Sequence, residues 1–330
     1  MSISILGAGA FGAAMAVTLS KGRKDVMLWG RDAAALQEME KTRENLRYLQ
    51  GIDIPKTVTL IHDVKAALAS DIICLSVPMQ QLSNVLLACG TDLNGKTLVA
   101  CCKGIDLMTS EGPTALIKKH APTAKAAVLT GPSFAHDIAK GLPTALTLAC
   151  SDPTVRQSCQ DRLSTSSLRI YTSGDVIGAE LGAALKNVIA IACGATIGAG
   201  YGDSARAALM TRGYAEMCRI ANTLGAKEST LSGLSGFGDL SLTCMSDGSR
   251  NFSYGLALGR GCSFDPSVTV EGVATAKAVL HHPKLQGEDM PITRLVHHLS
   301  TGDVNVKEAM QELMSRPQKE ERNVNSPHRP

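Results

Sequence analysis

The fold of this chain is decided by the stretch Ile3-Ser4-Ile5-Leu6-Gly7-Ala8-Gly9-Ala10-Phe11-Gly12. Its apolar start predicts a short strand, and the apolar run that follows, to about Ser20, predicts a helix. A G-x-G-x-x-G pattern between strand and helix is typical of dinucleotide binding. Gly7 permits the tight turn, Gly9 lets a pyrophosphate approach the backbone, and Gly12 lets the helix pack on the strand. A glycine-rich turn without a ligand is the alternative.

The residue after the second strand bears on which dinucleotide fits. That strand is predicted over residues 25–30, and an acid at its end usually binds the ribose of NAD. The chain instead has Arg31, followed by Asp32. An arginine suits the 2′-phosphate of NADP, so NADP and NAD both stay open as the cofactor. The alternative is that these two residues only begin a solvated helix.

Further apolar runs alternate with helical stretches, which predicts a parallel sheet covered by helices on both faces. Ligands of such sheets bind outside the carboxyl ends of the strands. Pro78, Lys103 and the run 131–133 fall at such ends, so Lys103 is a candidate functional residue and not only a surface lysine. The predicted strands cover residues 71–77, 97–102, 126–129, 146–150 and 168–171.

The alternation of strands and helices stops near Ser173, and from Asp175 onward the pattern is helical. We therefore expect an α/β fold with a Rossmann-type dinucleotide-binding domain over 1–174. A helical substrate-binding domain is expected over 175–315. Residues 316–330 hold almost no apolar side chain, so they predict a disordered tail.

One lysine in the helical part is isolated from other charges. Between Glu180 and Asp203 only Lys186 is charged, in a run that is apolar on all sides, as in a buried helix. Small residues share its face, and burial there would lower the lysine pKa and make it a general acid/base. The alternative is a lysine whose stem is buried while its ammonium reaches water. A transmembrane span is disfavoured, because the run is rich in Gly and Ala and carries Lys and Asn near its middle.

Two expectations concern the elements around this helix. Residues 233–240 are interpreted as a glycine-rich loop that presents one carboxylate, Asp239. Asp203 is expected to cap a helix that ends at Gly225 and carries an Arg212–Glu216 ion pair on its surface.

Composition excludes several functional classes. The 330 residues carry a net charge of +3, which is too small to indicate nucleic acid binding. Five Phe, five Tyr and one Trp give no platform for stacking bases. Ten cysteines without a CxxC pair and histidines without ligand spacing indicate neither a disulfide framework nor a metal site. Because the first strand begins by Ile3, no signal peptide is expected and a cytoplasmic location is the default.

Taken together, these motifs resemble NAD(P)-dependent glycerol-3-phosphate dehydrogenase of the bacterial type. The blocks occur in the family's order, from residue 3 to about 315. The resemblance implies reversible reduction of dihydroxyacetone phosphate to sn-glycerol 3-phosphate for phospholipid synthesis, and usually a homodimer. It is carried by Gly7–Gly12, Lys103-Gly104, Gly131–Ala135, Leu185–Val188, Gly236–Leu240, Ser249–Asn251 and Val270–Gly272.

The resemblance also implies roles for single residues. The general acid/base falls on Lys186, with Lys103 and Asp239 as catalytic partners and Asn187 and Thr243 as weaker ones. The substrate positions match Lys103, Gly131, Ser133, Lys186, Asp239, Ser249, Arg250 and Asn251. The cofactor positions match Gly7, Gly9, Ala10, Phe11, Gly12, Arg31, Tyr48, Lys103, Ala135, Arg250, Thr269 and Glu271. Many relatives have serine at the position of Ala10 and an aliphatic residue at that of Thr269, which leaves the cofactor preference open.

The chemistry agrees with these roles. Hydride addition to a ketone leaves an oxygen that needs a proton, which a lysine of lowered pKa supplies. Lys103 would add positive charge at that oxygen, Asp239 could hold Lys186 or a substrate hydroxyl, and Arg250 offers a planar fork for a phosphate. Another hydroxyacid or sugar-phosphate dehydrogenase of the same domain plan is one alternative. A non-catalytic NAD(P)-binding sensor is the other, but it gives no reason for the set of charged residues.

Overall fold

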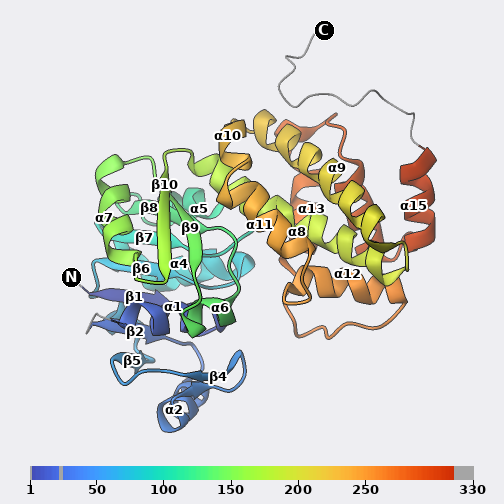
Figure 1. The fold of residues 1–330 in the computed structure, drawn as a ribbon. Coiled ribbons are helices and arrows are strands. Elements are labelled where there is room, and N and C mark those ends of the chain that lie inside the picture. The colour runs from blue at the N-terminus through green and yellow to red at the C-terminus, as the bar shows by residue number, and fades with distance from the viewer. Residues whose placement is uncertain (1, 22–24, 316–330) are drawn as a thin grey trace.

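The computed structural model describes residues 2–21 and 25–315, so the predicted tail over 316–330 lies outside the described residues. A sheet domain and a helical part stand side by side (Figure 1). Eight strands form one sheet in the order β10-β9-β8-β7-β6-β1-β2-β5. Their bounds are β1 (Ile3–Leu6), β2 (Val26–Trp29), β5 (Val58–Ile61), β6 (Ile72–Leu75), β7 (Thr97–Ala100), β8 (Lys125–Thr130), β9 (Thr144–Ala149) and β10 (Leu168–Ser173).

The predicted fold class is confirmed, with one difference in the sheet. Strand β9 pairs antiparallel with β8, and β10 pairs parallel with β9, so the last two strands run against the other six. The connection from β8 to β9 holds only a short helix, α6 (Ala135–Lys140), which packs on the first helix instead of crossing the sheet. Strand β9 therefore starts at the end of the sheet where β8 stops, which is possible because the two strands are antiparallel neighbours. A separate antiparallel ribbon of β3 (Glu44–Asn45) and β4 (Leu49–Asp53) was not predicted.

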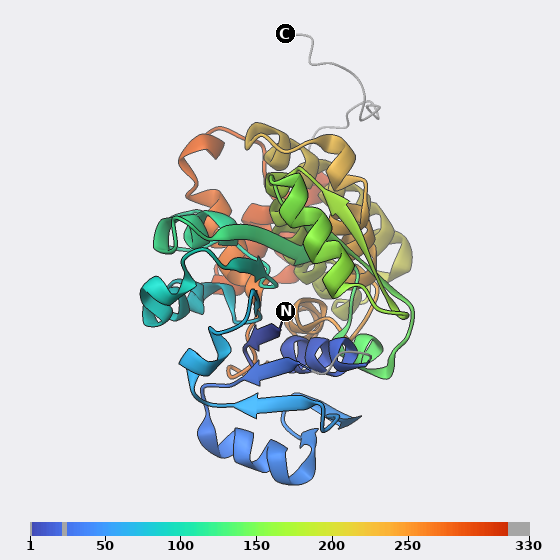
Figure 2. The same ribbon diagram turned by 90° about the vertical axis from the view of Figure 1, so that its left-hand side faces the viewer.

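Helices cover both faces of the sheet, as Figure 2 shows from the side of the sheet domain. The alternation of side chains along β1 places Ile5 in the apolar cluster on one face and Leu6 in the cluster on the other. The covering helices are α1 (Ala10–Ser20), α2 (Ala33–Thr42), α3 (Val64–Ala67), α4 (Leu82–Cys89), α5 (Pro113–His120) and α7 (Pro153–Leu163), with short 3₁₀ turns η1 (Met79–Gln81) and η2 (Gly90–Leu93).

The helical part is built around α8 (Val176–Gly198). This helix is long and apolar enough to cross a membrane, but 83% of its most apolar window is buried inside the protein, so it is a core helix. Around it lie α9 (Gly202–Thr223), α10 (Glu228–Leu231), the π-helix η3 (Leu234–Gly238), α11 (Asp239–Cys244), α12 (Arg250–Arg260), α13 (Glu271–Leu280), η4 (Pro283–Leu285), α14 (Pro291–Thr301) and α15 (Val306–Ser315).

Glycines bring α12 into backbone contact with α8. Gly194 and Gly198 of α8, and Gly255 and Gly259 of α12, each face a carbonyl oxygen of the other helix. A Cβ built on any of the four would lie only 2.0 to 2.3 Å from that oxygen. Spacing of four residues on both helices repeats the close approach one turn later, as in other helix pairs with small residues at the interface.

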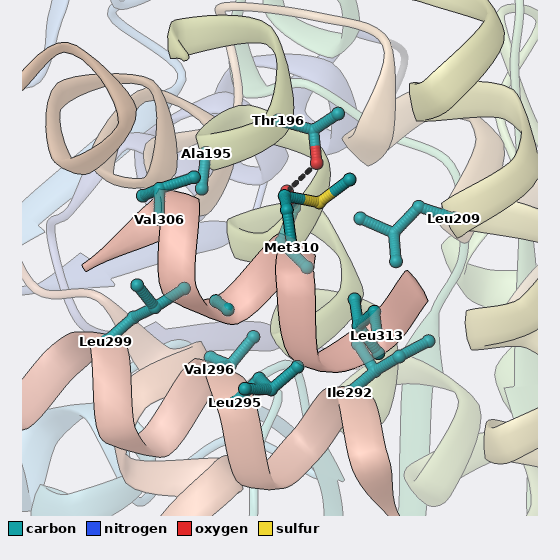
Figure 3. A pocket seen from close by; sticks show the side chains of 12 residues that line it. Ala195, Thr196, Leu209, Ile292, Leu295, Val296, Leu299, Val306, Met310 and Leu313 are labelled. Atoms are coloured by element: carbon teal, nitrogen blue, oxygen red, sulfur yellow. Dashed lines mark hydrogen bonds between the residues drawn. The ribbon is translucent and has the colours of Figure 1, made fainter. Parts of the chain in front are cut away.

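The last described helix, α15, packs over a small apolar cavity between α8, α9 and α14 (Figure 3). Its volume is about 20 Å³, which is too small for a substrate. Thr196 is the single polar residue of the wall, and its hydroxyl donates to the carbonyl of Ala192 at 2.9 Å. The cavity is therefore a packing defect of the core and not a candidate site.

Two expectations about α9 are wrong. The helix begins at Gly202, so Asp203 lies in its first turn and does not cap it. The predicted Arg212–Glu216 pair is absent, because Glu216 is 1% exposed and points into the core. Its carboxylate accepts the backbone N–H groups of Ile292 and Thr293 at 2.9 and 2.8 Å. These N–H groups open α14 and have no partner within that helix, so Glu216 caps α14.

The backbone contact between α8 and α12 yields a test of stability. We expect Gly255→Ala to lower the free energy of unfolding by at least ~1–3 kcal/mol, because the new Cβ would meet the Ile191 carbonyl oxygen at 2.0 Å. Denaturant unfolding measures this change. Gly9→Ala is the control, since nothing lies within 4 Å of its Cβ position. An unchanged unfolding midpoint for Gly255→Ala would show that the helices separate without cost.

Candidate active site

Three charged side chains meet where the sheet domain adjoins α8 and α11. Lys103 follows β7, Lys186 lies in the middle of α8, and Asp239 is the first residue of α11. The Lys103 Nζ donates to Asp239 Oδ2 at 2.6 Å, and the Lys186 Nζ donates to Asp239 Oδ1 at 2.9 Å. One carboxylate therefore bridges a lysine of the sheet domain and a lysine of the helical part.

The position of Lys186 decides between the two interpretations of this residue. Lys186 is 6% exposed, and its Nζ also donates to the hydroxyl of Thr243 at 2.6 Å. The ammonium is thus held inside the protein and does not reach into bulk water, so the alternative of a water-exposed ammonium is wrong. Thr243 therefore contacts Lys186, and the resemblance had implied it as one of two weaker catalytic partners. No hydrogen bond joins Lys186 to Asn187 among the described residues.

Burial and charge set the ionisation of this cluster. Burial lowers the pKa of Lys186 to about 8, although the Asp239 carboxylate opposes the shift; the Lys103 ammonium adds to it. Burial also disfavours the Asp239 carboxylate, which is 1% exposed, but the ammonium groups of Lys103 and Lys186 outweigh burial and keep its pKa below the ordinary value. The site therefore holds an anionic aspartate beside a lysine that can gain or lose a proton near neutral pH.

Asp239 is presented by a helix and not by the predicted loop. The π-helix η3 runs directly into α11, so the carboxylate stands at the junction of two helical segments. A Cβ on Gly182 of α8 would lie 2.5 Å from the carbonyl oxygen of Ser235 in η3. Part of the small-residue face of α8 is thus filled by the backbone of η3, and this contact fixes Asp239 relative to Lys186.

The loop after β8 adjoins the same cluster. The Lys103 Nζ donates to the carbonyl of Gly131 at 3.2 Å, and the Ser133 hydroxyl donates to the same carbonyl at 3.1 Å. Gly131 has φ +135°, and a Cβ there would meet Leu146, so glycine is required at this turn. Ala135 then begins α6. The structure thus brings the substrate candidates Gly131 and Ser133 to Lys103.

The start of α12 supplies a second set of polar groups. The Ser249 hydroxyl accepts the N–H of Phe252 at 3.2 Å and caps the helix, and the exposed Arg250 is its first residue. A helix N-terminus beside an arginine suits a phosphate. Asn251 is directed inward instead: it donates to Asn187 Oδ1 and accepts from the N–H of Gly272, each at 2.9 Å. These bonds tie α8, α12 and α13 together.

The glycine turn at the start of the sheet domain fits a dinucleotide. Gly7 has φ +119°, and a Cβ there would lie 2.2 Å from the carbonyl oxygen of Ser76; a Cβ on Gly12 would lie 1.9 Å from that of Gly7. Gly9 is different, because nothing lies within 4 Å of its Cβ position at the N-terminus of α1. A pyrophosphate can therefore approach the backbone there. The candidates Ala10 and Phe11 form the first turn of α1.

After the end of β2, Arg31 is exposed while Asp32 is engaged within the protein. The Asp32 carboxylate accepts the N–H groups of Ala34 and Ala35 at 3.0 and 3.1 Å, so it is used as the cap of α2. Arg31 is exposed and follows Gly30, whose Cβ position lies 3.2 Å from the Ala8 side chain in the glycine turn. Tyr48 is 50% exposed in the link between β3 and β4. Asn45 ties that ribbon to the turn by donating to the Ala8 carbonyl at 2.9 Å.

Glu271 ties the start of α13 to the sheet domain. Its Oε1 accepts the N–H of Met79 at 3.1 Å, and its Oε2 lies 3.4 Å from the Cβ position of Gly104. Burial raises the pKa of Glu271, while the Met79 N–H and the Arg250 guanidinium oppose the shift. Thr269 lies two residues earlier and is exposed, and no described contact brings it to this group.

Sequence reasoning gave no role to the carboxylate of α8, Glu180. Glu180 accepts the N–H of Thr114 at 2.7 Å at the start of α5, which ties α8 to the sheet domain. Burial raises its pKa to about 7. The glycine before α5 makes room for this carboxylate, since a Cβ on Gly112 would lie 2.5 Å from Glu180 Oε2. Within residues 2–21 and 25–315 no group of three or more metal-ligating side chains is found.

Comparisons with known proteins agree with this geometry. Residues 2–156 match the family model of the NAD-dependent glycerol-3-phosphate dehydrogenase N-terminus, and residues 175–311 match that of its C-terminus. The chain is 54% identical over 321 residues to glycerol-3-phosphate dehydrogenase (NAD(P)+) of Ruegeria sp. strain TM1040, covering 97% of this chain and 100% of that protein. The Cereibacter sphaeroides enzyme of the same name is 55% identical over 319 residues, with the same coverage.

Solved structures show the same relationship. The crystal structure of glycerol-3-phosphate dehydrogenase from Coxiella burnetii superposes with a TM-score of 0.89 at 34% identity, covering 96% of this chain and 99% of that one. A ketopantoate reductase from Ralstonia eutropha shares only the fold, with a TM-score of 0.62 at 16% identity over 95% of this chain and 100% of that one. The chain belongs to the NAD(P)-dependent glycerol-3-phosphate dehydrogenase family.

Proposed function

We propose that this protein catalyses the reversible reduction of dihydroxyacetone phosphate to sn-glycerol 3-phosphate with NAD(P)H. The observation that carries the proposal is the Lys103–Asp239–Lys186 cluster, in which Asp239 and Lys186 are buried, in a chain that also has a dinucleotide turn and an arginine at a helix N-terminus. The test is oxidation of NADPH or NADH by the purified protein, followed by absorbance. Cofactor oxidation that depends on dihydroxyacetone phosphate supports the proposal, and its absence with both cofactors would overturn it.

Lys186 is the proposed general acid/base. The bound nicotinamide supplies the hydride that adds to the carbonyl carbon, and the oxygen of the substrate then takes a proton from the Lys186 ammonium. A pKa of about 8 suits both directions, because the amine and the ammonium are both populated near neutral pH. Asp239 holds the Lys186 Nζ in place. The buried surroundings lower the lysine pKa below that of an exposed lysine.

The other charged groups place the substrate. Lys103, with an ammonium fixed between Asp239 and the Gly131 carbonyl, stabilises negative charge on the substrate oxygen. Arg250 and the capped N-terminus of α12 bind the phosphate. Ser133 lies on the loop after β8, which approaches α12 where the Phe134 ring lies 3.4 Å from the Cβ position of Gly248. Asn251 contributes by fixing α12 on α8 and α13, because both its amide groups are engaged there.

The cofactor is proposed to lie over the glycine turn, with the pyrophosphate at Gly9 and the adenosine ribose at Arg31. Glu271, which accepts from Met79, is close to the nicotinamide half. The remaining proposed cofactor contacts are Ala10, Phe11, Tyr48, Lys103, Ala135, Arg250 and Thr269. The ketopantoate reductase likeness supports a shared domain plan, but 54% identity over the full length to glycerol-3-phosphate dehydrogenases favours the triose phosphate as substrate.

Several further proposals rest on the family resemblance. They are a homodimer, a cytoplasmic location, a role in phospholipid synthesis, and a division into domains at residues 174 and 175. The end of β10 at Ser173 and the start of α8 at Val176 support the division. Light scattering of the purified protein tests the first: a mass of one chain at micromolar concentration would contradict the homodimer.

Lys186→Met tests the acid/base role. We expect turnover to fall by a factor on the order of 100 to 10,000, with cofactor affinity nearly unchanged. In the wild type, reduction should slow as pH rises through about 8 and oxidation should accelerate, since the first needs the ammonium and the second the amine. The variant should lose both inflections. Lys277→Met, at an exposed lysine of α13, is the control. Near-normal turnover of Lys186→Met would assign proton transfer to another group.

Arg250→Ala tests the phosphate site. A charge-assisted hydrogen bond is worth about 1.5–3 kcal/mol, so the loss of one or two should lower kcat/KM for dihydroxyacetone phosphate by roughly ten-fold to several hundred-fold. The weak rate with dihydroxyacetone, which has no phosphate, should barely change. Arg260→Ala, at the other end of α12, is the matched control. Equal losses on both substrates would make Arg250 a cofactor or structural residue.

Arg31→Ala tests the cofactor preference. The variant should bind NADPH more weakly while its affinity for NADH changes less, because only NADPH offers the 2′-phosphate. Titration of cofactor fluorescence measures both dissociation constants. The control is Lys56→Ala, which removes one exposed positive charge outside the glycine turn. If the affinities for both cofactors fall equally, Arg31 does not contact the 2′-phosphate.

A further inference from the structure

Asn45 is a buried amide in contact with the glycine turn. It lies in β3, is 2% exposed, and uses both ends of its side chain. The Nδ2 donates to the Ala8 carbonyl at 2.9 Å, and the Oδ1 accepts the backbone N–H of Tyr48 at 3.1 Å. A flipped amide would set a donor against the Tyr48 N–H and an acceptor against the Ala8 carbonyl, so these two partners fix the orientation of the side chain.

The ribbon that carries Asn45 is anchored to the sheet domain independently of the glycine turn. The Arg43 guanidinium donates to the carbonyls of Pro55 and Val58 at 2.6 and 3.1 Å. Val58 begins β5, the edge strand of the sheet. Leu49 of β4 is 0% exposed and belongs to the apolar cluster that includes side chains of α1. The ribbon is therefore a firm support, and Asn45 reaches the turn from a fixed position.

The peptide between Ala8 and Gly9 is the one that Asn45 holds. It is trans and planar, so its carbonyl and its N–H point in opposite directions. With the Ala8 carbonyl bound to Asn45, the Gly9 N–H points away from the ribbon. Within residues 2–21 and 25–315 this N–H has no hydrogen-bond partner, and Gly9 is only half-buried, with nothing within 4 Å of its Cβ position. The N–H is therefore open to a ligand at the start of α1, where a pyrophosphate fits.

Gly9 leaves the orientation of this peptide weakly constrained. A half-turn of the peptide changes ψ of Ala8 and φ of Gly9, and it would take φ of Gly9 from −76° to a positive value. Glycine adopts a positive φ at little cost, whereas a residue with a Cβ would resist it. Glycine is nevertheless needed there so that a pyrophosphate can approach the backbone. The hydrogen bond from Asn45 therefore supplies the constraint that a side chain at residue 9 would otherwise provide.

We propose that Asn45 is a positioning residue for the dinucleotide and keeps the Gly9 N–H directed at the pyrophosphate. It acts through the Ala8–Gly9 peptide and not by contact with the reacting atoms. Without the amide donor the peptide can flip, and its carbonyl oxygen then faces the negatively charged phosphates in place of the N–H. Because NADH and NADPH share the pyrophosphate, the two cofactors depend on Asn45 equally. This inference rests on the proposed placing of the cofactor over the glycine turn.

The test compares two variants of Asn45. Asn45→Ala removes both ends of the amide, whereas Asn45→Asp keeps the acceptor for the Tyr48 N–H and lacks the donor for the Ala8 carbonyl. We expect both variants to raise the dissociation constants of NADPH and NADH by the same factor, roughly ten- to hundred-fold, the value of one charge-assisted hydrogen bond. Titration of cofactor fluorescence measures both constants. At saturating cofactor, kcat and the KM of dihydroxyacetone phosphate should stay nearly unchanged, because the catalytic cluster is intact.

Asn94→Ala is the matched control. The Asn94 Oδ1 accepts the Thr123 hydroxyl at 2.9 Å, so this change also removes a hydrogen bond of a side-chain amide. Asn94 is exposed and precedes β7, whereas the glycine turn follows β1, so the two lie at opposite ends of a parallel part of the sheet. The control should leave both dissociation constants unchanged. A merely structural Asn45 would lower the melting temperature of its variants but leave cofactor affinity, measured well below that temperature, at the wild-type value.

The outcomes separate this inference from the proposed function. A wild type that binds neither cofactor overturns the proposed function, and the inference with it. A wild type that binds both, together with Asn45 variants of unchanged affinity, overturns the inference alone. A loss of NADPH affinity that NADH does not share also overturns it, as does a large fall in kcat at saturating cofactor. If Asn45→Ala does not fold, Asn45→Asp, which keeps the size of the side chain and the bond to Tyr48, decides by the same comparison.

Discussion

The whole site depends on how closely other backbones approach α8. Gly182 lets η3 lie against the helix, and Gly194 and Gly198 admit α12. Gly272 admits α13, since a Cβ built on it would lie 2.6 Å from the Asn187 carbonyl oxygen. Each approach sets where a functional side chain begins: Asp239 after η3, Arg250 on α12, Glu271 on α13. A methyl group at any of these glycines would push a whole helix outward, and protein interiors do not absorb such shifts freely.

Within this frame, the chemistry is set by one negative charge between two positive ones. Asp239 accepts from each lysine with a separate oxygen, so both lysines have a partner. Burial then acts most strongly on Lys186, the more enclosed of the two, while Lys103 keeps a side chain that is 20% exposed. The asymmetry gives two chemically identical groups different surroundings, and the separate roles proposed for Lys186 and Lys103 rest on that difference.

Local signals in the sequence were sufficient where the cause of the structure is local. The glycine turn and the apolar strands act through neighbours along the chain, and the apolar run around Lys186 predicts its burial; the structure confirms all three. Expectations failed where the partner is distant: Glu216 caps a helix 76 residues away, and β9 reverses because of where α6 packs. Glycine content suggested a loop before Asp239, but α8 stabilises that segment as a π-helix through contacts that no local pattern reveals.

The hydrogen bonds of the site span long stretches of chain. Lys103 and Asp239 are 136 residues apart, and Met79 and Glu271 are 192 residues apart. Such contacts form only after the intervening chain has folded and the two parts have docked. During synthesis, a nascent chain that has completed its sheet domain has the dinucleotide turn but lacks the carboxylate that organises both lysines. It also lacks Arg250 and Glu271, so the complete site exists only once the helical part has been synthesised.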